Sequence, residues 1–447
     1  MELLWALPAL VSRWLYRLVS PLDKRTAPRL LQLLVGLLFA RGRRTVTSWF
    51  RAAGIRDEFR PAYRAVHAAG RRADVMAFLV WATLVRPLLA GQSRLVFAVD
   101  DTPTRRYGPC VEGAGIHRDP SPGPSNAPFL YGHVWVVLAC LVTHQRWGTI
   151  ALPLLARLYI RARDVPRLPP ERGVPFRTKL EQAVQLLGWL KTWVQPGDLS
   201  VWLAIDGGYA KRPVLRPARA QQVTVVGRLP RNAALRSLPP TVRPPGKRGP
   251  MPTYGKDRIS LVKRAGQQRG WQQVRCQQYG AEQIKTIKTF LATWRPAGGV
   301  IRVVIVREKD GWHTFFCTDA QVSAAEVLSV AADRNALEQS FKNVKEVWGA
   351  GQQQLRNMHA NIGAFHLNLW MQTLVEAWAW PQAEEELVDR SAAPWDQEPR
   401  RPSQADKRNA LQQEILTQEI LAISGETGQP RGFRQRLESL VKLAAGR

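Results

Sequence analysis

The sequence predicts an α/β protein with a mixed sheet flanked by helices, a helical N-terminal part and a helical C-terminal part. Residues 1 to about 90 carry apolar side chains at helical spacing. From Ser93 onward, short apolar runs of strand length replace that pattern. The order that follows is three strands, a helix, a strand that ends in an acid, and a last helix that carries an acid. The acids therefore come from separate segments of the chain.

A basic segment, residues 41–55, lies inside the helical N-terminal part. Thr45 or Thr47 can cap a short helix there, and Gly54 can close it. The arginines that flank this helix are Arg41, Arg43, Arg44 and Arg51. We interpret the segment as a helix-turn-helix that reads DNA. An ordinary basic helical hairpin is the alternative.

Two apolar runs end in acidic residues. One run, which begins at Ser93, leads to Asp100 and Asp101, and a later run, 200–205, leads to Asp206. Open sheets place functional groups beyond the C-terminal ends of such strands. Adjacent residues of a strand point to opposite faces, so only one of Asp100 and Asp101 can face a shared site.

The rest of the sheet is expected from further apolar runs. Strands are predicted at 134–142, 147–160 and 221–229, with an amphipathic helix at 177–194. His133 precedes the first of these strands, and we expect it to be a structural histidine, with a place near the acids as the alternative.

A linker rich in Pro, Gly and basic residues follows at 238–256. Its Lys247, Arg248 and Lys256 either track phosphates or form a solvated loop. Strand-like pieces come next, at 271–279, 299–308 and 312–319. Within them Trp271 or Trp312 could stack on a flipped base, although a place in the core is the default for Trp.

The third acid is predicted on a helix. No Gly or Pro occurs between Ala331 and Trp348, so one helix can run unbroken. At about 100° per residue, it places Arg334, Glu338 and Lys345 on one stripe. The adjacent apolar face comprises Leu337, Phe341, Val344 and Trp348. This helix should therefore bury one edge and hold a carboxylate between two cations beside it.

Carboxylates from two strand ends and one helix can form a hard-oxygen site for Mg²⁺, with Mn²⁺ as the alternative. The ligands would be Asp100 (or Asp101), Asp206 and Glu338. Two ions about 3.5–4 Å apart would stabilise the attacking and leaving oxygens of a phosphoryl displacement. The alternative is that the first two acids lie in turns and the third forms a helix salt bridge.

At this point the chain resembles the DDE transposases of bacterial insertion sequences, in the cut-and-paste group marked by Tyr-x₂-Arg-x₃-Glu-x₆-Lys. Arg334, Glu338 and Lys345 match the last three positions, whereas Ala331 stands where the pattern has Tyr. Asp-x-Thr at 100–102 and Asp-x-Gly-Tyr at 206–209 resemble the group's first two acid motifs. The resemblance spans roughly residues 90 to 375. In this family the missing Tyr lies near the cleaved strand.

The resemblance implies an RNase H-like core, with metal-dependent strand cleavage and strand transfer at transposon ends. It implies that Asp100, Asp206 and Glu338 are the catalytic metal ligands, and the Asp-x-Thr spacing favours Asp100 over Asp101. It also implies a hairpin intermediate and a homodimer on paired DNA ends. Two alternatives remain. One is an inactive relative that binds DNA and represses transposition, as Ala331 would suggest, and the other is a nuclease of the same fold that does not join strands.

Several cations are expected to bind DNA in such an enzyme. Arg334 and Lys345 would hold phosphates near the scissile bond, unless they only pair with Glu338 within the helix. A Gly-Ala-Gly turn should end that helix, and the polar residues after it could contact the DNA backbone. These are Gln352, Gln353, Gln354 and Arg356.

Five segments follow from these observations. They are a helical N-terminal DNA-binding domain (1–90), the first part of the RNase H-like core (91–230), a β-rich insertion with return strands (231–320), the core helices that include Glu338 (321–380) and a helical C-terminal region (381–447). A capping box at Ser323 to Glu326 opens the helical part of the fourth segment. In the last segment, helices are predicted at 409–423 and 433–445.

The charge of the chain favours a nucleic-acid partner. Lys and Arg number 64 against 35 acids, a formal net charge of +29 over 447 residues. Such an excess suits a polyanion, here double-stranded DNA with terminal inverted repeats and a target, although a solvated basic surface is the bland alternative. An anionic membrane is disfavoured, because the apolar run 30–40 is only about half a bilayer span. The first ten residues lack the basic start of a signal peptide.

Cysteine is sparse, and its spacing suggests neither a zinc site nor a disulfide framework. The four are Cys110, Cys140, Cys276 and Cys317. Cys140 and Cys317 lie in apolar runs and are expected to be buried thiols. We therefore expect a reducing cytoplasm, with the protein associated with the nucleoid.

Overall fold

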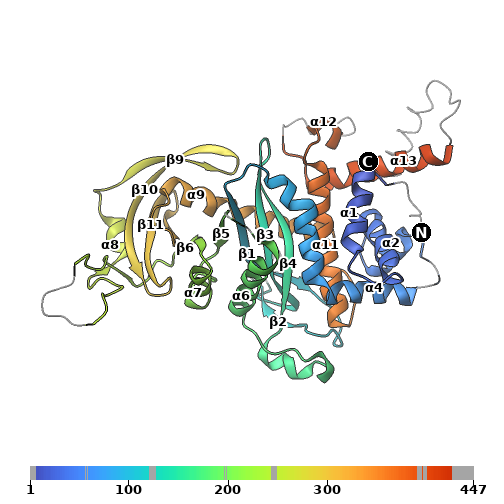
Figure 1. Cartoon of the computed structure of the whole chain (residues 1–447), viewed down its shortest axis with the longest axis horizontal. Coiled ribbons are helices and arrows are strands. Elements are labelled where there is room, and N and C mark those ends of the chain that lie inside the picture. The colour runs from blue at the N-terminus through green and yellow to red at the C-terminus, as the bar shows by residue number, and fades with distance from the viewer. Residues whose placement is uncertain are drawn as a thin grey trace.

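A mixed sheet of 12 strands runs through the part of the chain that the structure describes. This computed structural model describes residues 7–55, 57, 59–119, 127–195, 197, 199–242, 249–389, 395 and 400–424. The central strands are β1 (Arg94–Arg105), β3 (Phe129–His144), β4 (Gly148–Tyr159), β5 (Ser200–Ile205) and β6 (Val223–Arg228). Helices cover the sheet on one side of the molecule, and a β-rich part extends from the other (Figure 1). The predicted α/β class is confirmed.

The five central strands follow one another along the chain in the order that the sequence predicts. Their order in the sheet is β4-β3-β1-β5-β6, with β1 antiparallel to β3, β3 antiparallel to β4, and β5 parallel to both β1 and β6. Helix α6 (Lys179–Trp189) connects β4 to β5, and α7 (Arg212–Ala220) connects β5 to β6. The arrangement is consistent with an RNase H-like core.

The sequence suggests that the first strand ends at Asp100 and Asp101, but β1 continues past these acids to Arg105. Its parallel pairing with β5 stops at Val99 opposite Ile205. On the other side, the antiparallel pairing with β3 continues to Arg105 opposite Gly132. Because the long strand β3 keeps hydrogen-bonding it, β1 extends past Asp100 and Asp101. These acids nevertheless lie just beyond the end of the parallel neighbour, next to the point where the chain leaves β5.

The β-rich segment continues the central sheet. Its main strands are β9 (Gln272–Gln278), β10 (Ala281–Trp294), β11 (Gly299–Glu308) and β12 (Gly311–Cys317). Strand β12 pairs antiparallel with β6, so these strands extend the edge of the core. Strand β10 was missed because its first half is polar and largely exposed, with no apolar run to indicate it. The short pieces β7 (Leu235–Arg236), β8 (Arg258–Ile259) and α8 (Leu261–Gly266) complete this half, whereas β2 (Gly115–Arg118) pairs with β3 in the core.

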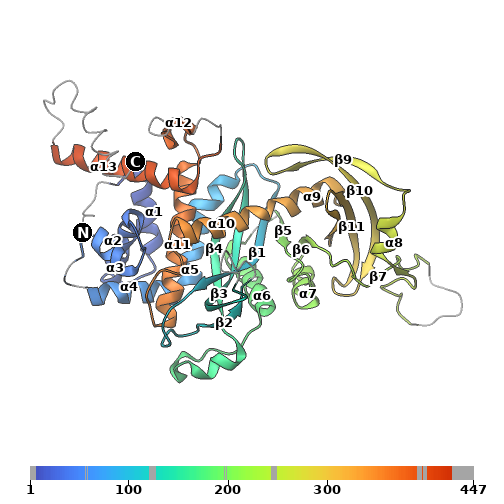
Figure 2. The ribbon, with the colours of Figure 1, turned by 180° about the vertical axis from the view of Figure 1, so that it is seen from behind.

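The predicted unbroken helix is divided at Arg334. Helix α9 (Ala324–Asp333) and helix α10 (Asn335–Glu346) follow one another, as Figure 2 shows. The Leu337 amide donates to the Arg334 carbonyl, a tighter three-residue spacing at the junction. Absence of Gly and Pro permits a helix but does not fix its hydrogen bonding, so the single-helix prediction was wrong at this point. Ser323 caps α9 as expected, accepting from the Glu326 amide.

The N-terminal part is helical, as predicted. It contains α1 (Ala9–Val19), α2 (Thr26–Phe39), α3 (Val46–Ala52), α4 (Phe59–Arg71) and α5 (Ala73–Val80). Thr45 caps α3 through the Ser48 amide, and Gly54 after the helix has a φ of +71°. Most of this two-turn helix is buried, including Trp49 and Phe50, so it presents little surface to a DNA groove. The helix-turn-helix interpretation therefore gains no support from α3.

Helix α11 (Met358–Ala379) packs against α4 and β4. Its Gly363 meets Gly70 of α4 so closely that a Cβ on Gly363 would lie 1.9 Å from the Val66 carbonyl oxygen. The short α12 (Glu384–Leu387) follows. No helix within the described ranges is both long and apolar enough to cross a bilayer.

Helix α13 (Gln404–Ser424) contains the predicted helix 409–423. Its Arg408 donates to the carbonyl oxygens of Leu38 and Ala40 at the end of α2, and to that of Val347 after α10. One side chain thus joins three separate segments. The predicted helix 433–445, and Lys247 and Arg248 of the linker, lie outside the described residues.

Candidate active site

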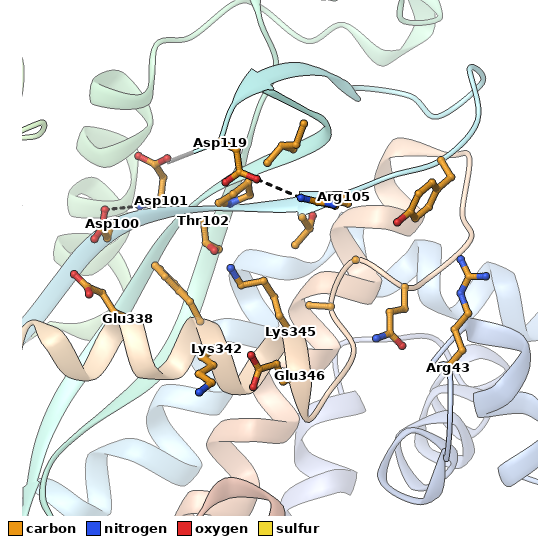
Figure 3. Close-up of a pocket in the computed structure, with 18 of the residues that line it drawn as sticks. Arg43, Asp100, Asp101, Thr102, Arg105, Asp119, Glu338, Lys342, Lys345 and Glu346 are labelled. Carbon is orange, nitrogen blue, oxygen red and sulfur yellow. Dashed lines mark hydrogen bonds and ion pairs between the residues drawn. The ribbon is translucent and has the colours of Figure 1, made fainter. Parts of the chain in front are cut away.

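Six acids line a cavity of about 1350 Å³ between β1 and α10, and four of them concern the predicted site. Asp100 and Asp101 come from β1, Asp206 directly follows β5, and Glu338 lies on α10. Figure 3 shows the Glu338 carboxylate pointing from the helix toward Asp100 on the strand. The fold therefore brings the three predicted ligands to one cavity.

A single guanidinium joins two of these acids. Arg334 donates from Nη1 to Asp100 Oδ2 over 2.5 Å and from Nη2 to Glu338 Oε1 over 2.6 Å. The Arg334 side chain is 20% exposed and that of Asp100 is 17% exposed, so this half of the bridge is largely shielded from water, whereas the Glu338 side chain is 53% exposed. Arg334 is thus the partner of Glu338 that the helical spacing predicts, and it also bonds to Asp100 on β1.

Burial is the main influence on Asp100. It raises the pKa of the Asp100 carboxyl to about 7, against the opposing effect of the Arg334 charge. The nearby negative charge of Asp206 raises the same pKa further. Like charges held together in a shielded place favour protonation or a bound cation.

Asp101 has partners of its own. Its Oδ1 accepts from the Tyr209 hydroxyl over 3.0 Å, and its Oδ2 accepts from Lys179 Nζ over 2.6 Å. The backbone amide of Tyr209 also donates to Asp206 Oδ1 over 3.0 Å. Burial, and next the charge of Asp101, raise the pKa of Tyr209. Asp101 therefore fixes β1 to α6 and to the Asp206 loop, while Asp100 faces Glu338.

The residue types and placement fit a hard divalent cation. Asp100 and Glu338 converge on one cationic group, Asp206 is near enough to act on Asp100, and carboxylate oxygens are the donors such ions prefer. Within the described ranges, no three His, Cys, Asp or Glu side chains are yet grouped closely enough to hold an ion. Arg334 is the cation that two of them hold in this structure.

The family comparison agrees with this geometry. A family model described as DDE superfamily endonuclease matches residues 17–295, more than half of the chain. The chain belongs to this family. A comparison with curated proteins found no match.

Membership indicates an enzyme of the nuclease or transposase type that acts on DNA. The matched segment includes Asp100 and Asp206 but ends before Glu338. The place of Glu338 in this DDE endonuclease therefore rests on the cavity and on the contact with Arg334.

Two lysines of α10, Lys342 and Lys345, line the acid cavity but point in different directions. Lys345 lines the cavity and points toward β1, whereas Lys342 points away from the strand (Figure 3). Burial lowers the pKa of Lys345, and the charge of Asp119 opposes that effect. Lys345 is thus placed where an anion could reach it, as the helical stripe predicts.

Of the other arginines predicted to bind DNA, Arg43 lines the acid cavity, Arg356 lines only an adjoining cavity, and Arg44 lines neither. Arg43 lines the acid cavity and, with Arg356, an adjoining cavity of about 370 Å³. The Arg44 amide donates to Gln352 Oε1 over 2.7 Å, and its guanidinium donates to the Glu346 carbonyl over 3.3 Å. Burial lowers the pKa of Arg44. Arg44 therefore secures the turn after α10.

That turn has the predicted Gly-Ala-Gly form, with a φ of +75° at Gly349 and +101° at Gly351. Gln353 is buried and donates to the carbonyls of Arg44 and Gly349. Gln354 is exposed and lines both cavities. Of the three glutamines, Gln353 is therefore structural and Gln354 is open to a ligand.

Three aromatic residues from the sequence analysis lie away from the acids. His133 is fully buried, accepts from Arg106 Nε over 3.1 Å, and donates to the Glu112 carbonyl, so its structural interpretation is confirmed. An Arg307 guanidinium lies 4.3 Å from the Trp271 ring, and an Arg231 guanidinium lies 4.7 Å from the Trp312 ring. Neither Trp lines the acid cavity.

Sequence reasoning missed Lys179 and the joining role of Tyr209. Tyr209 belongs to the Asp-x-Gly-Tyr motif, so a signal for it was present. Lys179 is the first residue of α6, after the Thr178 cap, and no motif marks it. Cys140 and Cys317 are buried, as predicted.

Proposed function

We propose that the chain is a DNA transposase of an insertion sequence, which cuts strands at the element's ends and transfers them to a target. The observation that carries this proposal is the convergence of Asp100 and Glu338 on one cation in a cavity that Asp206 also lines. Family membership supports the type of enzyme, and this convergence supports the location of the metal ligands.

The three carboxylates Asp100, Asp206 and Glu338 would hold Mg²⁺ or Mn²⁺, with two ions in the complete site. Bound there, such ions activate water for attack and stabilise charge on the phosphoryl oxygens. Tyr209 and Lys179 keep β1 fixed through Asp101, so the spacing of the acids is set by the fold. The RNase H-like core thus provides a rigid support for the ligands.

DNA would lie along the cations of the two joined cavities. Lys345, Arg43 and Arg356 line them, and Arg334 is close enough to the acids to contact the scissile phosphate. Arg bonds a phosphate through two donors, and Lys acts as a point charge. A homodimer on paired ends, a hairpin intermediate and a location on the nucleoid belong to the same proposal. The N-terminal segment 1–90 would contribute through Arg43 at the cavity edge.

A second candidate is a relative that binds DNA without cutting it. Ala331 favours it, because this residue lines a cavity beside Asp206 and Arg334 where a larger side chain would fit. A nuclease that cuts without joining is the third candidate, and the product of the reaction separates it from a transposase.

The test is cleavage of a duplex that carries the element's own ends, in Mg²⁺ and in EDTA. Wild type and Asp206→Ala are compared, and strand transfer to a second duplex is followed in the same reactions. Metal-dependent cutting and joining that Asp206→Ala abolishes would support the transposase. Tight binding without cutting in either protein would point to the binding-only relative, and cutting without joining would point to the nuclease.

A further inference from the structure

Arg334 occupies a decisive place among the acids. Its side chain extends from the junction between α9 and α10 and donates to Asp100 and Glu338 through separate nitrogens. Both carboxylates belong to the proposed metal site, so the guanidinium and a divalent cation need the same oxygen atoms. Two cations cannot share these lone pairs at bonding distance without strong repulsion.

We propose that Arg334 is a built-in counter-cation that DNA draws away, so that binding of DNA and binding of the divalent metal are coupled. In the free protein the guanidinium holds Asp100 and Glu338 and competes with the metal. When a DNA phosphate arrives, the guanidinium bonds to it and leaves the carboxylates to the metal. This inference rests on the proposed function and adds a mode of regulation to the same site.

The guanidinium has room for this movement. Arg334 does not line the acid cavity itself, but together with Ala331 and Asp206 it lines a neighbouring cavity of about 730 Å³. Ala331 lies one turn earlier on the helix and contributes only a methyl group beside Arg334. A phosphate in either cavity would offer the guanidinium a bidentate partner.

The coupling has a sign that can be measured. Because the carboxylates favour Arg334 when no metal is present, removing its charge should tighten metal binding in the absence of DNA. By reciprocity, whatever DNA gains from metal, metal gains from DNA. Without Arg334, DNA should increase the affinity for metal less than in wild type, and metal should increase the affinity for DNA less.

The experiment measures Mn²⁺ affinity by electron paramagnetic resonance at pH 8, without DNA. Wild type is compared with Arg334→Gln, Arg334→Lys and Lys342→Gln. The last variant removes one charge from the wall of the acid cavity, at a side chain that points away from β1. We expect Arg334→Gln to bind Mn²⁺ about tenfold more tightly than wild type, within the usual range of coupling. Lys342→Gln should change the affinity much less, and Arg334→Lys should fall between because it cannot bridge two carboxylates.

A second readout uses DNA binding with and without Ca²⁺, followed by fluorescence anisotropy of a labelled end duplex. The affinity gain on adding Ca²⁺ should be larger for wild type than for Arg334→Gln. Equal gains, or Mn²⁺ affinity in Arg334→Gln no tighter than in wild type, would overturn the coupling. If circular dichroism shows that Arg334→Gln is unfolded, the comparison of Arg334→Lys with wild type decides the same question.

Failure of the coupling is separable from failure of the proposed function. Asp206→Ala is the reference for the metal site. If wild type binds no Mn²⁺ beyond that variant, the proposed metal site is wrong and the coupling falls with it. If wild type binds Mn²⁺ through Asp206 and Arg334→Gln does not tighten it, only the coupling is wrong.

Discussion

Tyr209 donates its hydroxyl to Asp101 over 3.0 Å and thereby joins the loop after β5 to the interior of β1. The ring is 3% exposed, so no solvent replaces the bond if it is lost. Since the Tyr209 amide also holds Asp206, one residue sets the distance between two acid-bearing elements. The following predictions test this arrangement and its surroundings.

Tyr209→Phe should destabilise the fold by about 1–3 kcal/mol, because it leaves a partly buried carboxylate oxygen of Asp101 without its donor. Urea unfolding measures the loss. Tyr16→Phe is the matched control, because the Tyr16 ring is 43% exposed and should change stability little. Equal stability of both variants and wild type would show that the Tyr209 bond contributes nothing.

Glu338→Gln should abolish cleavage of end duplexes and leave DNA affinity nearly intact. The amide keeps the volume of the side chain but removes the charge that a metal ligand needs. Glu346→Gln, on the same helix and cavity wall, serves as the control and should still cut. Cleavage by Glu338→Gln at the wild-type rate would remove Glu338 from the site.

DNA affinity should fall steeply with salt, because each phosphate contact releases counterions. Lys345→Gln should reduce the slope of log affinity against log salt by about 1. Lys24→Gln, an exposed residue that does not line the cavity, should leave the slope unchanged. A flat salt response in wild type would contradict DNA binding through phosphates.

Gly363→Ala should cost about 3 kcal/mol, because its Cβ would lie 1.9 Å from the Val66 carbonyl oxygen and push α4 away from α11. Gly188→Ala on α6 is the matched control, since nothing lies within 4 Å of its Cβ. That change should stabilise the helix by up to about 1 kcal/mol. Thermal unfolding of the two variants gives opposite shifts if the close helix crossing is real.

The stability of the metal-free protein should depend on Asp100 between about pH 4 and 7. Its pKa is raised from 3.8 to about 7, so in this window the folded state binds a proton that the unfolded state has lost. Stability from this group is therefore present at low pH and is lost as the pH rises through 7. Asp100→Asn should lack this loss in urea titrations with EDTA. A parallel pH dependence in both proteins would assign the effect to other groups.

Local patterns predicted several elements closely. The apolar run at 200–205 became β5 with the same bounds, because a strand buried on both faces needs continuous apolar residues. The apolar face of α10 is buried at Leu337, Phe341 and Val344, as helical spacing requires. Motif spacing likewise placed Asp100, Asp206 and Glu338 at one cavity.

What the sequence could not predict depends on contacts between distant residues. The extension of β1 past Asp100 follows from pairing with β3 over a long strand, and no local pattern reveals it. The ion pair between Lys179 and Asp101 depends on how α6 packs against the sheet. The bridge from Arg334 to Asp100 crosses 234 residues of sequence, whereas the helical stripe predicts only its link to Glu338.

The hydrogen bonds from Arg408 to the end of α2 and to Val347 after α10 bear on how mutations inactivate copies of this gene. A copy with a stop codon between positions 338 and 408 would still encode all three acids. Its product would lack the side chain that fastens the Glu338 helix to the N-terminal helices. Intact acids in a genome sequence are therefore a poor guide to whether such a copy still makes a working enzyme.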